Sequence, residues 1–150
     1  MGKEWVSLIS MKVLYIVRGL SGSGKSSIAK ELVNEIWDEE KKSFVKDFYS
    51  ADDYFTDKYG NYNFDPTKLA DAHAECFSNV ELAMQRNCVR KIAVANTFSQ
   101  AWEAEPYFKL AEKHDFHPFV LECQNDFGNI HGVPQKSIDT MKERWEDRLI

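Results

Sequence analysis

The residues with the clearest chemical signature are those from Gly19 to Ser26, which read GLSGSGKS. They match the pattern G-x-x-x-x-G-K-[ST] at every fixed position. The glycines allow backbone conformations in which consecutive amide groups point at phosphate oxygens, and the start of a following helix adds a favourable dipole. This phosphate loop, or P-loop, predicts a site for the phosphates of a nucleotide.

Two side chains of the P-loop have predicted roles of their own. We expect Lys25 to contact the β- and γ-phosphates of ATP, and the hydroxyl of Ser26 to bind Mg²⁺. ATP and Mg²⁺ are therefore the cofactors that the sequence predicts. The residues predicted to bind the nucleotide are Gly19, Leu20, Ser21, Gly22, Ser23, Gly24, Lys25, Ser26 and Ser27.

The hydrophobic pattern predicts the elements that position this loop. Residues 12–18 form a short apolar run typical of a buried strand, and apolar residues from Ser26 to Trp37 recur at helical spacing up to a polar stretch at 38–42. Further strands are expected at residues 44–50, 91–97 and 117–123, and further helices from Thr67, at 101–114 and at about 135–149. Strands that alternate with helices predict an α/β, three-layer fold with a parallel sheet.

Composition limits the classes of protein that this chain can represent. Its 150 residues are enough for one domain, so we expect a single P-loop domain at 11–150 after an N-terminal extension at 1–10. The net charge of −5 disfavours a protein that coats nucleic acid non-specifically. We expect no membrane span, no secretory signal and no metal cluster, because the long apolar runs and cysteine spacings of such features are lacking. The expected location is cytoplasmic.

Further motifs follow the P-loop, namely SADDYF (50–55), GNYNF (60–64), AHAEC (72–76), ANTFSQAWEAEPY (95–107) and NIHGVP (129–134). In order and spacing, the set resembles the small P-loop kinases related to the phage polynucleotide 5′-hydroxyl kinase, a family that includes a domain of a mammalian ubiquitin-ligase-binding protein. The resemblance extends over about residues 11–148. It implies a P-loop NTPase fold with a four-stranded parallel sheet, and transfer of the ATP γ-phosphate to a 5′-hydroxyl of DNA or RNA.

The resemblance also implies catalytic and substrate-binding residues. Asp52, the first Asp of the D-D-Y element, corresponds to the general base, and Lys25 is the second predicted catalytic residue. A carboxylate just beyond a strand is suitably placed, because open α/β sheets bind ligands at the carboxyl ends of their strands. The predicted substrate-binding residues are Asp53, Phe55, His73, Asn96, Thr97 and His131.

Three positions depart from the family pattern. Phe55 and Gly128 stand where the family has arginines, and Ala95 stands where it has an aspartate. Arginines at such sites stabilise the transferring phosphoryl group and accelerate transfer by ~10³–10⁵-fold. The chain is therefore expected to transfer phosphate slowly or to an unusual acceptor, unless Lys136, Arg144 or Arg148 supplies the cation.

The loop at residues 51–66 has two interpretations. Its aromatic side chains can stack on an acceptor base or pack the loop against the sheet and the next helix. We expect packing for most of them and an acceptor contact for Phe55. His73 lies on the apolar stripe of its helix, so simple burial is the alternative to a substrate role. The aromatic residues are Tyr54, Phe55, Tyr59, Tyr62 and Phe64.

Three functions remain open at this point. The first is a Mg²⁺·ATP-dependent phosphotransferase similar to polynucleotide 5′-hydroxyl kinases. The second is a kinase of nucleosides or nucleotides, because P-loop folds serve many acceptors and the acidic charge suits a small one. The third is a catalytically degenerate module that binds ATP and a partner.

Overall fold

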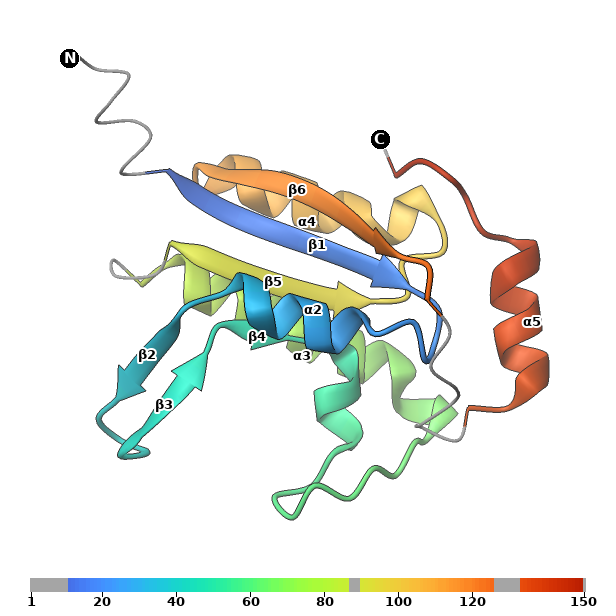
Figure 1. Cartoon of the computed structure of the whole chain (residues 1–150), viewed down its shortest axis with the longest axis horizontal. Coiled ribbons are helices and arrows are strands. Elements are labelled where there is room, and N and C mark those ends of the chain that lie inside the picture. The colour runs from blue at the N-terminus through green and yellow to red at the C-terminus, as the bar shows by residue number, and fades with distance from the viewer. Residues whose placement is uncertain (1–10, 87–89, 126–132, 150) are drawn as a thin grey trace.

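The computed structural model describes residues 11–86, 90–125 and 133–149. The predicted N-terminal extension, Gly128 and His131 lie outside these ranges. The chain forms a four-stranded sheet from β1 (Lys12–Gly19), β4 (Phe48–Tyr49), β5 (Lys91–Asn96) and β6 (Phe116–Cys123). The order is β4-β5-β1-β6, and every neighbouring pair is parallel, which confirms the predicted α/β fold (Figure 1).

Helices cover both faces of this sheet, as Figure 1 shows for α2 in front and α3 and α4 behind. They span Lys25–Leu32 (α2), Leu69–Met84 (α3) and Ala101–Lys113 (α4). Because successive side chains of a strand point to opposite faces, Leu14 and Ile16 pack in the α3 and α4 layer, whereas Val17 packs with Ala29 of α2. Two apolar cores therefore hold the three predicted layers together.

The first predicted helix is too long. The helix α2 ends at Leu32, and Glu35–Asp38 forms the strand β2, which pairs antiparallel with β3 (Ser43–Lys46). The apolar residues at 33–37 suit either structure, but pairing with β3 brings Trp37 into edge-to-face contact with Phe44 at 5.1 Å between ring centroids. The predicted strand at 44–50 is accordingly divided into β3 and β4.

The last predicted helix is also too long. The helix α5 spans Gln135–Glu143, and Trp145 and Leu149 follow it in non-helical chain. Both still face the protein, since Leu149 is 7% exposed and Trp145 stacks on Arg18. The predicted helix from Thr67 begins instead with a 3₁₀ turn at Pro66–Lys68, before α3. The remaining strands and α4 agree with the prediction to within one or two residues.

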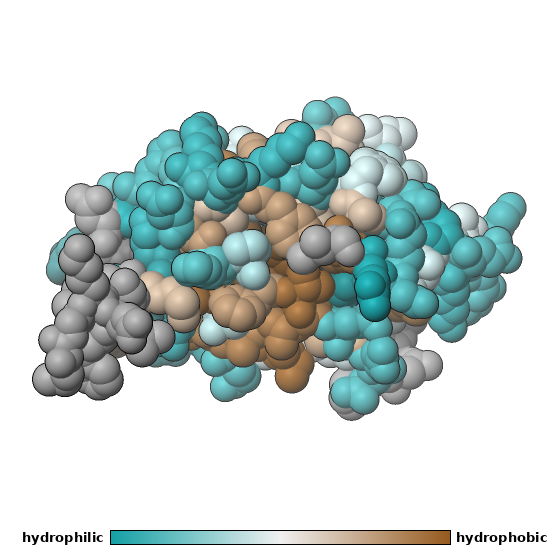
Figure 2. All heavy atoms as spheres, turned by 90° about the horizontal axis from the view of Figure 1, so that it is seen from above, coloured by the Kyte–Doolittle hydropathy of each residue, from teal (hydrophilic) through white to brown (hydrophobic). Residues whose placement is uncertain are grey.

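Two surface features complete the description. The edge strand β6 leaves Phe119 and Val120 exposed, and Figure 2, viewed from the side on which β6 lies, shows an apolar area there. The helices of the described ranges are too short or too polar to cross a membrane.

Candidate active site

The P-loop connects the end of β1 to the start of α2. Gly22 and Gly24 have φ angles of 82° and 85°, which side-chain-bearing residues rarely adopt. Gly24 is the N-cap of α2, no side chain caps this end, and the first turn contains no acidic residue. The amide groups at this helix end are therefore suited to bind an anion.

Close packing fixes the beginning of the loop. A β-carbon at Gly19 would lie 2.2 Å from the Ser23 hydroxyl oxygen and 3.0 Å from the carbonyl oxygen of Cys123, so only glycine fits. Ser23 is 3% exposed, and its hydroxyl has no hydrogen-bond partner within the described ranges. A buried hydroxyl of this kind is rare in proteins and fits a loop that wraps around a phosphate.

Lys25 lies inside this loop and is 8% exposed. Its ammonium group donates a 3.5 Å hydrogen bond to the carbonyl of Leu20. Burial lowers the pKa of Lys25, and the negative charge of Asp52 opposes that shift. Lys25 and Asp52, the two predicted catalytic residues, are thus close enough to interact electrostatically.

Asp52 lies in a short 3₁₀ turn, η1 (Ala51–Phe55), which follows β4. Ser50 caps the turn, because its hydroxyl accepts a hydrogen bond from the amide of Asp52 at 3.2 Å. In turn, the Asp53 carboxylate accepts a hydrogen bond from the amide of Ser50, also at 3.2 Å. This capping box gives Asp53 a structural role, and its substrate contact stays a prediction.

Asn96 fastens the same turn to the sheet. Its side chain is buried at the end of β5, and its Oδ1 accepts a 2.8 Å hydrogen bond from the amide of Ala51. Its Nδ2 lies 3.8 Å from the sulfur of Cys76 on α3. The side chain of Asn96 therefore holds η1, while Thr97 is half-buried at the next position.

Tyr62, which the sequence analysis named only among the aromatic residues of the loop, contacts the predicted base. Its hydroxyl donates a 3.2 Å hydrogen bond to Oδ1 of Asp52. Burial and the nearby charge of Asp52 raise the pKa of Tyr62. The GNYNF motif contains Tyr62, but the sequence does not show that the hydroxyl of this residue contacts the Asp52 carboxylate.

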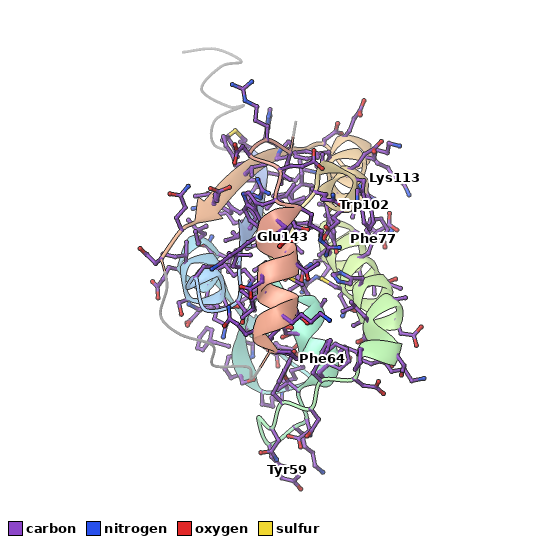
Figure 3. The ribbon with its side chains drawn as sticks, turned by 90° about the vertical axis from the view of Figure 1, so that its right-hand side faces the viewer. Tyr59, Phe64, Phe77, Trp102, Lys113 and Glu143 are labelled. Carbon is purple, nitrogen blue, oxygen red and sulfur yellow. The ribbon has the colours of Figure 1, made fainter. Side chains whose placement is uncertain are left out.

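Phe55 is 7% exposed and packs edge-to-face against Tyr54 and Phe64, with ring centroids 5.2 Å and 5.1 Å apart. Its ring fills the core below the loop, which favours packing over an acceptor contact. The acceptor contact of Phe55 stays a prediction. Packing is confirmed for Tyr62 as well, whereas Tyr59 is 78% exposed at the loop tip (Figure 3).

His73 lies on α3, with its side chain exposed to solvent, so the expected burial on the apolar stripe is wrong. Partial burial of the ring nevertheless lowers the pKa of His73, and the carboxylates of Glu103 and Asp52 oppose this shift. The ring therefore lies on the same side of the molecule as Asp52, which is compatible with the predicted substrate role.

A buried arginine supports the P-loop from behind. Arg18 is 1% exposed and precedes Gly19; its guanidinium donates to the carbonyls of Phe98 and Glu146 at 2.8 Å and 2.7 Å. It pairs with Glu122 at 3.3 Å and stacks on Trp145, whose ring centroid lies 3.9 Å away. The sequence analysis included Arg18 only as a strand residue, because these partners are distant in sequence.

The C-terminal segment lies across the carboxyl ends of the strands, at the same edge of the sheet as the P-loop. Figure 3, which faces the carboxyl ends of the strands, shows α5 in front of them. Lys136 and Arg144 are exposed, and Arg148 lines a 430 Å³ cavity with Arg18, away from η1. None of the three forms an ion pair within the described ranges, and their role as the missing cation stays a prediction.

Comparisons with known proteins agree with this geometry. Residues 14–130 match a family described as AAA domain, AAA_33. Human NEDD4-binding protein 2 is 34% identical over 143 residues, which are 89% of this chain but only 8% of that protein. The uncharacterized protein PM0531 of Pasteurella multocida is 30% identical over 140 residues, 87% of this chain and 75% of the relative.

Two solved structures share the fold. A Chloroflexus aurantiacus protein described as a candidate kinase superposes with a TM-score of 0.51 at 17% identity, over 77% of this chain and 60% of the other. The AvrRxo1-ORF1:-ORF2 complex gives a TM-score of 0.50 at 15% identity, over 79% and 38%. At these identities the likeness concerns the fold alone.

The family match covers most of the chain and includes the P-loop and the turn that holds Asp52. The relative from Pasteurella multocida is matched over most of its own length. The chain therefore belongs to the AAA_33 family of AAA domains, and the matched region includes its P-loop.

Proposed function

We propose that this protein transfers the γ-phosphoryl group of Mg²⁺-bound ATP to a hydroxyl group, with Asp52 as the general base. The observation that carries the proposal is the convergence of a desolvated Lys25 and a fixed Asp52 at the carboxyl ends of β1 and β4. This is the edge of a parallel sheet at which ligands bind.

The chemistry divides between the two sides of the site. Asp52 accepts the proton of the acceptor hydroxyl as that oxygen forms its bond to phosphorus. The bond between the γ-phosphorus and the bridging oxygen breaks, and ADP leaves with the electron pair. Lys25 stabilises the negative charge on the moving phosphoryl group, and its buried position strengthens this interaction.

Ser26 fits the predicted magnesium role. It is half-buried in the first turn of α2, next to Lys25, where a hydroxyl accompanies the phosphate-binding amides. A magnesium ion held there would neutralise charge on the β- and γ-phosphate oxygens.

The first candidate acceptor is the 5′-hydroxyl end of DNA or RNA. The resemblance of the ADDYF, AHAEC and NIHGVP motifs to the polynucleotide kinases supports it. The acceptor-side residues that remain available for this role are His73 and Thr97, together with Asp53 if its cap opens toward the substrate.

A nucleoside or another small neutral alcohol is the second candidate, and local charge favours it. The acceptor side carries several negative charges near Asp52, those of Asp53, Glu75 and Glu103. Lys30 supplies a positive charge close to Asp53. Residues 126–132, DFGNIHG, contain no lysine or arginine. Each added phosphate of a polynucleotide would be repelled by these carboxylates.

The test is transfer from γ-labelled ATP with Mg²⁺ to 5′-hydroxyl DNA, 5′-hydroxyl RNA and free nucleosides. Lys25→Ala serves as the blank for label that arises without the protein's own site. Label on an oligonucleotide supports the first candidate, and label only on nucleosides supports the second. ATP binding without transfer to any acceptor would reject phosphotransfer and leave the degenerate ATP-binding module.

A further inference from the structure

The segment that follows η1 turns back and returns a tyrosine to the catalytic aspartate. Thr56 and Tyr62 form an antiparallel bridge, and the amide of Asn63 donates to the carbonyl of Phe55 at 2.9 Å. The hydroxyl of Tyr62 thereby reaches Oδ1 of Asp52, ten residues earlier in the chain, at 3.2 Å.

This returning loop is braced at its tip. The Asp57 carboxylate accepts hydrogen bonds from the amides of Tyr59 and Asn61 at 2.8 Å and 2.9 Å. Gly60 has a φ of 83° and lies in open space, so the turn uses the left-handed conformation that glycine tolerates. The loop therefore holds its shape through its own contacts, without help from a substrate.

The ring of Tyr62 is braced as well. It lies edge-to-face against the buried ring of Phe55, with centroids 6.2 Å apart and an angle of 77° between planes. Phe55 in turn belongs to the main core, which includes Leu14 and Ile92 of the sheet. The position of the Tyr62 hydroxyl is therefore set by the packing of the domain.

A hydrogen bond to one oxygen of a carboxylate restricts the rotation of the carboxylate plane. It thus favours one direction for the second oxygen, and a general base must lie within hydrogen-bond reach of the proton that it removes. Burial raises the pKa of Tyr62, so its hydroxyl keeps its proton and remains a donor through the neutral range.

We propose that Tyr62 is a positioning residue for phosphoryl transfer, which orients the carboxylate of Asp52 toward the acceptor hydroxyl. The proposal rests on the proposed function, in which Asp52 is the base. Tyr62 acts through Asp52 and takes no proton in the reaction.

The test compares the rate of transfer and the KM for ATP in wild type, Tyr62→Phe, Asp52→Asn and the double variant. Phenylalanine keeps the ring against Phe55 and removes only the hydroxyl. We expect Tyr62→Phe to lower kcat about tenfold, the size expected for a hydrogen bond to a charged group, with the KM for ATP unchanged. Tyr54→Phe, which removes an exposed hydroxyl beside the same ring, is the matched control and should transfer like wild type.

The double variant separates positioning from a general loss of structure. If Tyr62 acts through the base, Tyr62→Phe has no further effect once Asp52→Asn has removed the base. An equal loss of kcat in both backgrounds, a raised KM for ATP, or wild-type kcat in Tyr62→Phe would overturn the inference and leave the proposed function intact. Absence of transfer by the wild-type protein to every acceptor would overturn both together.

Discussion

The side chain of Asn96 is joined to the backbone of Ala51 by a 2.8 Å hydrogen bond. This bond links the end of β5 to the turn that carries Asp52. Since β5 lies between β4 and β1, and β1 leads into the P-loop, Asn96 sets the lateral spacing between the two halves of the candidate site. Asn96, at the end of a central strand, thus contributes to the placement of η1 relative to the P-loop.

The first prediction concerns this bond. Asn96→Ala leaves the amide of Ala51 buried without its partner, which should lower the free energy of unfolding by ~1–3 kcal/mol. Urea denaturation measures this change. Transfer should fall more than ATP binding, because η1 and Asp52 are released while the P-loop keeps its contacts. Unchanged stability would show that another group satisfies the Ala51 amide.

Local patterns were sufficient to predict most of the fold. The P-loop, the β1 strand and the alternation of strands and helices depend on residues close together in sequence, and the structure confirms them. The end of α2 was mispredicted because Ile36 and Trp37 fit both a helical and a strand pattern. Only pairing with β3, which is a contact between separate segments, decides between the two.

The site was predictable in part for the same reason. The P-loop motif points to Lys25 and the family resemblance to Asp52, and their catalytic roles stay predictions. Arg18 and Tyr62 contact partners that no local pattern reveals. Phe55 was predicted to contact the substrate because it stands at a family arginine position, but the structure shows its ring packed in the core. A phenylalanine ring has no charged group that favours exposure to water, and Phe55 is buried.

The second prediction separates the roles of Lys25 and Asp52, the two proposed catalytic residues. Lys25→Ala and Asp52→Ala should both reduce transfer to a small residual rate, but only Lys25→Ala should weaken ATP binding strongly, as calorimetric titration would show. Burial lowers the pKa of Lys25, which means that the charged ammonium group destabilises the ligand-free fold. Lys25→Met should therefore lose ATP binding without losing stability in the absence of ATP. A marked loss of stability would contradict this account of the buried ammonium.

The third prediction concerns Arg18. Arg18→Met leaves the carbonyls of Phe98 and Glu146 without their donor, and it removes the partner of Glu122 and the stacking on Trp145. Loss of one partner from a buried charged network typically costs ~3–5 kcal/mol, and urea unfolding should show a change of that size. Arg148→Met, at an exposed position, is the matched control and should change stability by no more than ~0.5 kcal/mol.

The last prediction concerns the acid stability of the contact between α3 and α4. Hydrogen bonds from His114 and Lys113, both at 3.0 Å, lower the pKa of Glu81 below its ordinary value of 4.5. A carboxyl group whose pKa is lower in the folded state stabilises the protein above its unfolded pKa, and this contribution disappears as the pH falls through the folded pKa. Glu81→Gln should therefore lower the urea midpoint at pH 7, and its difference from wild type should be smaller at pH 3, below the ordinary pKa of 4.5.

The control for Glu81 is Glu112→Gln, which removes an exposed carboxylate of α4 and should leave the urea midpoint close to wild type at both pH values. Equal shifts for Glu81→Gln at pH 7 and pH 3 would mean that the side chain acts through its packing and not through its charge. A shift confined to pH 7 would instead assign the acid sensitivity of this contact to Glu81 itself, since glutamine preserves the size of the side chain and loses only its titration.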